Sequence, residues 1–180
     1  MDTERGKILL AIARAAISCA LNIPKAADET APWLTGQGAC FVTLTQHGTL
    51  RGCIGSLQVH RSLLDDVKHN AVSAALNDSR FNPLSAAELD ITNIEISLLS
   101  LPQAMTFNDE ADALTQLRPH VDGVVFEYRN HRSTFLPQVW EQLPQPQKFM
   151  AHLKYKAGLP VDFWSPEVKL SRYTVEKVKE

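Results

Sequence analysis

Residues 49–57, TLRGCIGSL, place an arginine, a cysteine and two glycines within five positions. A cysteine thiolate is a nucleophile, and a nearby cation lowers the pKa of the thiol from which it forms. On a strand, Arg51 and Cys53 would share one face and lie about 7 Å apart along the chain. This spacing predicts a thiol with a cation beside it, an arrangement suited to covalent chemistry.

Gly52 and Gly55 flank the cysteine, although strands disfavour glycine because it adds entropy cost and offers no side chain to pack. The missing side chains permit a β-bulge, or the close approach of another backbone or of a ligand. In the structural alternative, Cys53 is a small buried hydrophobic residue and the glycines let a helix pack tightly. Spacing alone favours this alternative over a reactive thiol.

The segment ACFVTLTQ precedes this run and reads as the first strand of a hairpin. A two-residue turn needs positive φ at its centre, and the His-Gly pair at positions 47–48 can adopt it. In the resulting register Cys53 faces Val42, and Arg51 and Cys40 lie on the same face of the hairpin. We therefore expect both cysteines and the arginine on one side of the sheet.

The order of expected elements mixes hairpins with helices and shows no regular strand-helix alternation. This order predicts an α+β fold with a mainly antiparallel sheet flanked by helices. Within it, the spacing from Ser85 to Glu88 is that of a capping box and predicts a short helical turn. Helices are expected over residues 7–21, 62–78, 108–118 and 146–157, and strands over 39–46, 49–55, 91–100, 123–137 and 168–178.

The first expected helix contains an apolar run that could be mistaken for an export signal. Arg14 interrupts that run, and its apolar residues fall on one helical stripe. These features favour an amphipathic helix over a signal peptide. The stripe comprises Leu9, Ala13, Ala16, Ile17, Ala20 and Leu21. No apolar run in the chain is long enough to cross a membrane.

Bulk composition limits the possible function classes. The 180 residues suit one domain, and 18 basic against 20 acidic side chains give a formal net charge of -2. The chain therefore has no bulk electrostatic attraction to nucleic acid or anionic lipid. Cys19, Cys40 and Cys53 form an odd, sparse set, which indicates free thiols and a cytoplasmic location. No CxxC, HxxxH or glycine-rich phosphate motif identifies a metal or a cofactor.

Several segments resemble those of the AMMECR family, whose bacterial and archaeal members are called AmmeMemoRadiSam system protein A. Residues Leu50–Gly55 read LRGCIG and match the family's hexapeptide without a change. The segment Asp78–Phe81, followed by PL, resembles the family's Asp-x-Arg-Phe-x-Pro-Leu segment. Further resemblances are carried by IEISLLS, VDGVVF, TFLPQVW and KAGLP, so that the match runs from about residue 36 to residue 164.

The resemblance implies one domain over residues 1–180, with an α+β fold of two unequal lobes and the hexapeptide near a cleft. It implies Memo-type and radical-SAM proteins as partners, because the family's name reflects its association with them. It supplies no reaction, since the family's biochemical role is unsettled. One departure is that Lys154 and Tyr155 stand where many relatives have a cysteine before KAGLP. A mechanism that needs a second thiol there is therefore excluded.

Two further residues could take part in chemistry. Arg80 lies beside Asp78 after an expected helix end, and it either forms a surface ion pair that fixes the loop or binds an anion. Glu95 lies on the polar face of an otherwise apolar strand. If that face is solvated, Glu95 is an ordinary surface residue. If the face is covered, burial raises the pKa of the Glu95 carboxyl and suits it to acid-base catalysis.

Three functions remain compatible with these residues. The favoured one is an enzyme that acts on a small or nucleotide-like substrate, with Cys53 and Glu95 as catalytic residues. The second is a non-catalytic binding or scaffold module that works with Memo-type and radical-SAM partners. The third, a nucleic-acid-associated factor, is disfavoured by the acidic balance. The residues expected to bind substrate are Arg51, Gly52, Gly55 and Arg80.

The sparse cysteine set generates a first prediction, which is that the chain contains no disulfide. Thiol titration of the unfolded, unreduced protein should find all three cysteines free. The same titration after reduction is the control. A lower count before reduction than after it would contradict the prediction.

Overall fold

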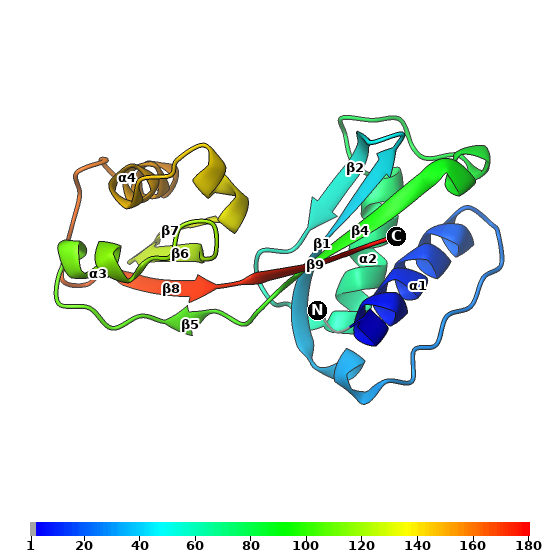
Figure 1. Cartoon of the computed structure of the whole chain (residues 1–180), viewed down its shortest axis with the longest axis horizontal. Coiled ribbons are helices and arrows are strands. Elements are labelled where there is room, and N and C mark those ends of the chain that lie inside the picture. The colour runs from blue at the N-terminus through cyan, green and yellow to red at the C-terminus, as the bar shows by residue number, and fades with distance from the viewer. Residues whose placement is uncertain (1–2) are drawn as a thin grey trace. The chain divides into compact units, whose positions relative to one another are not determined.

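The computed structural model describes residues 3–180 and shows two compact units (Figure 1). The larger unit consists of the residues up to 99 together with 176–180, and the smaller unit consists of residues 100–175. Each unit has a sheet and a hydrophobic core of its own. The prediction of an α+β fold with antiparallel sheets, flanking helices and two unequal lobes is confirmed.

The larger unit packs helices against a five-stranded sheet whose strand order is β2-β1-β4-β9, with β3 paired to β1. Its helical elements are α1 (Thr3–Ala20), η1 (Pro32–Thr35), α2 (Leu63–Leu76) and η2 (Ala86–Ile91). Its strands are β1 (Gln37–Gln46), β2 (Thr49–Gly55), β3 (Arg61–Ser62), β4 (Thr92–Leu99) and β9 (Val175–Lys179). Strand β1 is antiparallel to β2, β3 and β4, and β2 is an edge strand.

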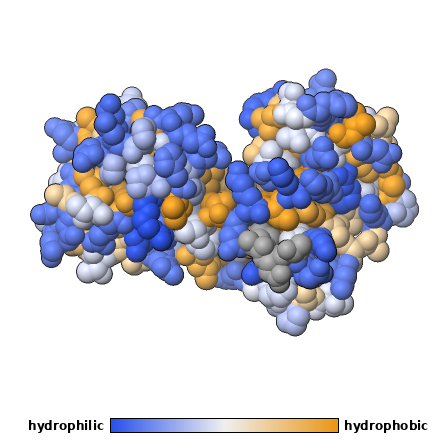
Figure 2. All heavy atoms as spheres, in the orientation of Figure 1, coloured by the Kyte–Doolittle hydropathy of each residue, from blue (hydrophilic) through white to orange (hydrophobic). Residues whose placement is uncertain are grey.

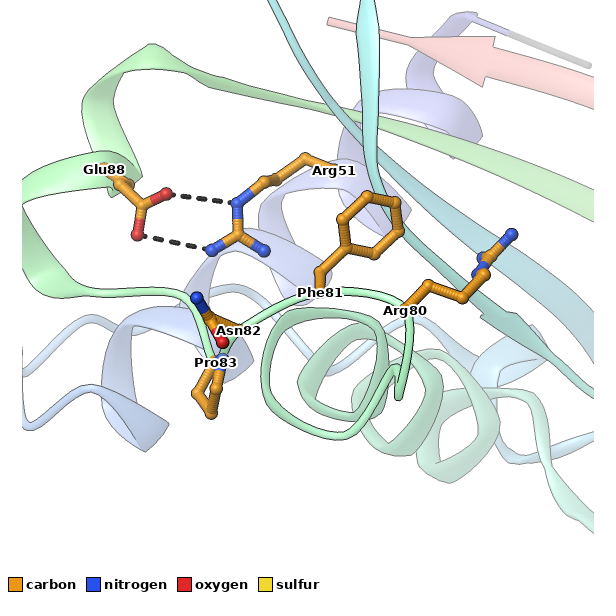
Figure 3. A pocket seen from close by; sticks show the side chains of 6 residues that line it. All are labelled: Arg51, Arg80, Phe81, Asn82, Pro83 and Glu88. Carbon is orange, nitrogen blue, oxygen red and sulfur yellow. Dashed lines mark hydrogen bonds and ion pairs between the residues drawn. The ribbon is translucent and has the colours of Figure 1, made fainter.

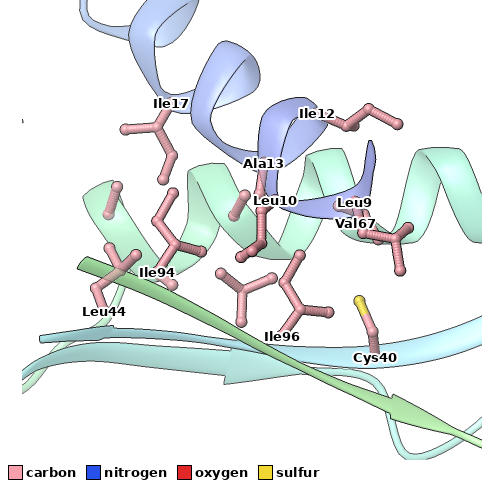
Figure 4. Packing of buried hydrophobic residues seen from close by; sticks show 14 of the residues in the cluster. Leu9, Leu10, Ile12, Ala13, Ile17, Cys40, Leu44, Val67, Ile94 and Ile96 are labelled. Carbon is pink, nitrogen blue, oxygen red and sulfur yellow. The ribbon is translucent and has the colours of Figure 1, made fainter. Parts of the chain in front are cut away.

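Strand β1 alternates between two faces of this sheet. Its residues Cys40, Val42 and Leu44 are fully buried in the core that α1 and α2 complete. Figure 4 shows Cys40 and Leu44 directed from the sheet toward these helices, together with Ile94 and Ile96 of β4. The residues between them on β1 are half-buried on the other side. We call the two sides the helix-covered face and the opposite face.

The smaller unit has a four-stranded antiparallel sheet in the order β5-β8-β6-β7. Its core includes Trp140 stacked on Phe149, with ring centroids 3.8 Å apart. Its strands are β5 (Gln103–Ala104), β6 (Gly123–Tyr128), β7 (His131–Phe135) and β8 (Lys169–Tyr173). Its helical elements are α3 (Glu110–Gln116), η3 (Pro137–Glu141) and α4 (Pro146–Lys156).

The turn between β1 and β2 is the predicted two-residue turn. Its central residues, His47 and Gly48, have φ angles of 49° and 79°, as such hairpin turns require. Next to the turn, Gln46 pairs with Thr49. The hairpin therefore starts in the register that the sequence predicts.

The predicted register is wrong further along the strand, because β2 contains a bulge. Leu50 and Gly52 pair with consecutive residues of β1, so Arg51 is an extra residue without a partner on that strand. As a result Cys53 pairs with Thr43 rather than Val42. Since Thr43 lies on the opposite face, the Cys53 side chain points away from the helices and from the buried Cys40.

The two glycines of β2 accommodate close contacts, one on each face of the sheet. A Cβ atom on Gly52 would lie 2.1 Å from the carbonyl oxygen of Ala74 in α2. A Cβ atom on Gly55 would lie 2.2 Å from the ring of Phe41, its partner on β1. Both glycines are therefore explained by packing. The alternative in which a helix packs tightly on this strand describes Gly52 correctly.

Hydrophilic residues cover much of the visible face of each unit, with apolar patches between them (Figure 2). The first expected helix is α1, and Leu9, Ala13 and Ile17 of its predicted stripe are buried in the core. Among residues 3–180, no helix combines the length and the apolar character that a bilayer crossing requires.

The Gly52 contact generates a second prediction, on stability. Gly52→Ala should lower the free energy of unfolding by about 1–3 kcal/mol, because the added methyl overlaps the backbone of α2. The control is Gly36→Ala, because its added Cβ would lie 3.4 Å from its nearest neighbour and its φ of -65° suits alanine. Urea titration followed by circular dichroism measures both. Equal midpoints for the two variants would contradict the prediction.

Candidate functional site

The backbone of Cys53 faces the free edge of the sheet and is bonded there by side chains rather than by another strand. Its N–H donates to Oδ2 of Asp78 at 2.9 Å, and its carbonyl oxygen accepts from Nη2 of Arg80 at 3.4 Å. The Cys53 thiol lies 3.3 Å from Oγ1 of Thr43. The loop after α2 therefore covers the edge of β2 at the cysteine, as charged groups often do at sheet edges.

Asp78 and Arg80 form a bidentate ion pair. Nε and Nη2 of Arg80 donate to the two carboxylate oxygens of Asp78 at 2.9 and 2.6 Å. These bonds, followed by the one from the Cys53 N–H, hold the pKa of the Asp78 carboxyl well below its usual range. The same hydrogen bonds with Asp78 are the largest cause that raises the pKa of Arg80. Arg80 is thus the cation that bonds to Cys53, at its backbone carbonyl.

Arg51 forms a second bidentate pair, with Glu88 of η2. Its Nε and Nη2 donate to the Glu88 carboxylate at 3.1 and 3.3 Å. The same carboxylate accepts bonds from Ser85 at 2.8 Å in the predicted capping box, and from Gln46 at 3.4 Å. The Arg51 bonds are the largest cause that lowers the Glu88 pKa from 4.5 to about 2.

The bulge directs Arg51 away from Cys53. Gln46 follows Cys40, Val42 and Leu44 in the alternation of β1, so it lies on the helix-covered face. Its amide and the Arg51 guanidinium both donate to the Glu88 carboxylate. The Arg51 guanidinium therefore lies on the helix-covered side, whereas the Cys53 thiol bonds to Thr43 on the opposite face. The prediction that Arg51 and Cys53 share one face is wrong, because the extra residue reverses the alternation between them.

Arg51 and Arg80 nevertheless border one pocket of about 440 Å³ (Figure 3). Each uses Nε and Nη2 for a carboxylate, which leaves Nη1 without a hydrogen-bond partner among the described residues. The Nη1 atom of Arg51 is buried, whereas the Arg80 side chain is 53% exposed. The pocket is lined by Arg51, Arg80, Phe81, Asn82, Pro83 and Glu88.

Cys53 and Glu95, the expected catalytic pair, do not line this pocket. Both lie on the opposite face, where Thr43 pairs with Cys53 on one side and with Glu95 on the other. Two strand spacings of about 4.8 Å place Glu95 roughly 10 Å from Cys53. Glu95 forms an ion pair with Lys177 at 3.3 Å, with 31% of its side chain exposed. Its acid-base role stays a prediction.

The three thiols differ in their exposure. Cys19 is exposed, and its thiol donates to the carbonyl of Lys25 at 3.2 Å. It lies on the side of α1 away from Ile17 and the other buried residues. The fully buried thiol is that of Cys40, whose pKa is raised chiefly by burial. Exposure therefore gives no reason to expect Cys53 to react faster than Cys19.

Sequence reasoning missed Phe81, Asn82, Pro83 and Glu88 as pocket residues. Glu88 was identified only as a capping residue, and the remaining three belonged to a loop between expected elements. One signal was available, because Phe81 is an aromatic residue that follows three polar residues in a loop without helix or strand periodicity. Among the residues that the structure describes, no cluster of histidine, cysteine or acidic side chains has the arrangement of a metal site.

Comparisons with known proteins follow the resemblance seen in the sequence. The model of the AMMECR1 family matches residues 10–178. A protein of Methanococcus aeolicus is 36% identical over 180 residues, which cover 98% of this chain and 90% of that protein. A protein of Methanothermobacter thermautotrophicus is 34% identical over 188 residues, which cover 98% of this chain and 94% of that protein. The crystal structure of an uncharacterized protein from Pyrococcus horikoshii aligns with a TM-score of 0.78 at 29% identity. The alignment covers 98% of this chain and 92% of that protein.

The bonded Glu88 carboxylate generates a third prediction, on pH. Because folding lowers its pKa from 4.5 to about 2, its contribution to stability is present above about pH 4.5 and is lost as the pH falls toward 2. Glu88→Gln should therefore be less stable than wild type at neutral pH and lose less stability across that interval.

Urea midpoints measured at several pH values test this prediction. The control is Glu167→Gln, which removes a carboxylate from an exposed ion pair with Arg129 and should change the midpoints little. Parallel pH profiles for wild type and Glu88→Gln would show that the ionised Glu88 carboxylate does not contribute to stability in this way.

Proposed function

We propose that this chain, which belongs to the AMMECR1 family, binds a small anionic ligand in the pocket bordered by Arg51 and Arg80. The supporting observation is that two guanidinium groups, each fixed by a carboxylate, border one pocket, and that neither Nη1 atom has a hydrogen-bond partner within residues 3–180. Guanidinium groups suit carboxylates and phosphates, since they are always charged and present donors in a planar fork. Fixing each fork beforehand reduces the entropy lost when a ligand binds.

The pocket offers donors but few acceptors, which favours an anion. Both oxygens of the Glu88 carboxylate already accept bonds from Arg51, and Ser85 or Gln46 adds to each. Glu88 therefore has little capacity left to accept a bond from a ligand. Arg80 is the accessible donor, whereas the buried Nη1 of Arg51 becomes a second donor only if the pocket wall shifts.

The size of the pocket limits the ligand to a small molecule. Its volume of about 440 Å³ lies within the range of roughly 300–1,000 Å³ that is usual for small-molecule sites. The two guanidinium groups are balanced by Asp78 and Glu88, so the pocket carries no large net charge. The ligand would therefore be recognised by directed hydrogen bonds more than by a general electrostatic field.

The proposal extends to catalysis, with Cys53 as the nucleophile. Arg80 supports this role because it borders the pocket and also bonds the Cys53 carbonyl. A ligand held by Arg80 that projected past the edge of β2 would come close to the thiol. The specific observation that favours the alternative, a non-catalytic binding module, is that the thiol itself lies on the opposite face. Memo-type and radical-SAM proteins stay predicted partners for either function.

The pocket generates a fourth prediction, on ligand binding. Arg80→Lys should weaken binding of a small anion about tenfold or more, because lysine keeps the charge but loses the unbonded Nη1 donor. Arg129→Lys is the matched control, since Arg129 is an exposed arginine in an ion pair outside the pocket. A screen of phosphates and carboxylates by thermal shift identifies ligands, and calorimetry gives their affinities. Equal weakening of anion binding in both variants would contradict the proposal that Arg80 binds the anion in this pocket.

Cys53→Ser separates the enzyme from the binding module. The substitution should leave ligand affinity nearly unchanged, because the thiol does not line the pocket. If Cys53 is the nucleophile, its sulfur forms a bond to the ligand as a leaving group departs from the ligand. Mass spectrometry should then detect this covalent adduct for wild type but not for the variant, although the variant retains binding. Equal turnover in wild type and variant would exclude Cys53 as the nucleophile, whereas binding without any turnover in wild type would favour the binding module.

A further inference from the structure

Phe81 is an aromatic residue that contributes to the pocket instead of to a core. Its side chain is half-buried, yet it belongs to neither hydrophobic cluster of the described chain. The Arg80 guanidinium carbon lies 5.4 Å from the centre of the ring. Figure 3 shows the ring between Arg51 and Arg80 at the pocket wall. A large apolar side chain here is not explained by packing of the larger unit.

The loop that carries Phe81 is anchored at both ends. At its start, the Phe81 N–H donates to the carbonyl of Asp78 at 3.0 Å, and the Asp78 side chain is held by Cys53 and Arg80. At its end, Leu84 is buried in the core, and its N–H donates to the carbonyl of Ala75 at 2.8 Å. The ring is thus presented to the pocket by a fixed backbone.

We propose that Phe81 is the stacking platform that selects the ligand, and that the ligand is a flat heteroaromatic ring joined to a phosphate, as in a nucleoside monophosphate. This inference rests on the proposed anion-binding function. Aromatic side chains stack on nucleobases, and such stacking tolerates different bases because every base has a flat face. The phosphate would be bound by the exposed guanidinium of Arg80, whose carbon lies over the ring at 5.4 Å from its centre.

The remaining pocket residues agree with such a ligand. Asn82 is exposed and its side chain has no hydrogen-bond partner among the described residues, so its amide can both donate to and accept from the edge of a base. Pro83 restricts the backbone of Asn82 to extended conformations and so limits where that amide can lie. One flat surface, one anion donor and one amide at a single pocket correspond to the base and phosphate of a nucleotide.

Calorimetry with four probes tests the inference: inorganic phosphate, ribose 5-phosphate, and adenosine and cytidine monophosphates as the two ring-bearing ligands. Wild type should bind both nucleotides between about fivefold and a hundredfold more tightly than ribose 5-phosphate. Phe81→Leu should reduce this ratio to about one without changing the affinity for ribose 5-phosphate. Phe81→Trp should maintain or increase the ratio. The matched control is Phe107→Leu, at a half-buried phenylalanine outside the pocket.

The outcomes distinguish this inference from the function on which it rests. If ribose 5-phosphate binds in an Arg80-dependent way but nucleotides bind no more tightly, the anion site stands and the stacking role of Phe81 is wrong. A nucleotide preference that survives in Phe81→Leu would also overturn it. If none of these phosphates binds to wild type, this inference fails, and if the carboxylates of the thermal-shift screen do not bind either, the proposed anion site fails with it. Urea midpoints of the Phe81 variants, compared with wild type, show whether a loss of binding comes from unfolding.

Discussion

The close contact between β2 and α2 at Gly52 determines where the rest of the site lies. Because Gly52 has no side chain, the backbone of α2 at Ala74 approaches the strand directly. The helix ends soon afterwards at Leu76, so the following loop starts beside the free edge of β2. Asp78 and Arg80 then reach the backbone of Cys53. Any side chain at position 52 would move the helix, and with it this loop.

The bulge next to Gly52 provides the second half of the pocket. With an extra residue in β2, the Arg51 guanidinium turns to the side on which α2 and the loop lie, and there it meets Glu88 of η2. Arginines that lie on β2 and on the loop after α2 are thereby brought to one pocket. Each is held by a carboxylate whose pKa folding lowers, so the two carboxylates stay ionised at lower pH than unbonded side chains would.

Local sequence signals predicted the elements but not their long-range contacts. The turn at His47 and Gly48 and the capping box at Ser85 depend on residues within a few positions of one another, so both could be predicted. The glycines permitted a bulge as one of two alternatives, but its presence and position could not be predicted, because a one-residue shift depends on packing between β2 and a helix that follows it in the chain. The bonds of Cys53 to the loop after α2 join residues 25 or more positions apart. No local pattern encodes them.

The division of β2 into two sides limits how chemistry could occur here. The pocket lies on the side of Arg51, and the Cys53 thiol lies on the other, bonded to Thr43. Among the residues that line the pocket, Arg80 is the one with a described bond to Cys53. A ligand could therefore react with the thiol only by passing the edge of the sheet at Arg80, where its anion would already be bound. In an enzyme, Arg80 would position the substrate for attack by Cys53. In a binding module, Arg80 would instead keep the ligand in the pocket, on the side of the sheet away from the thiol.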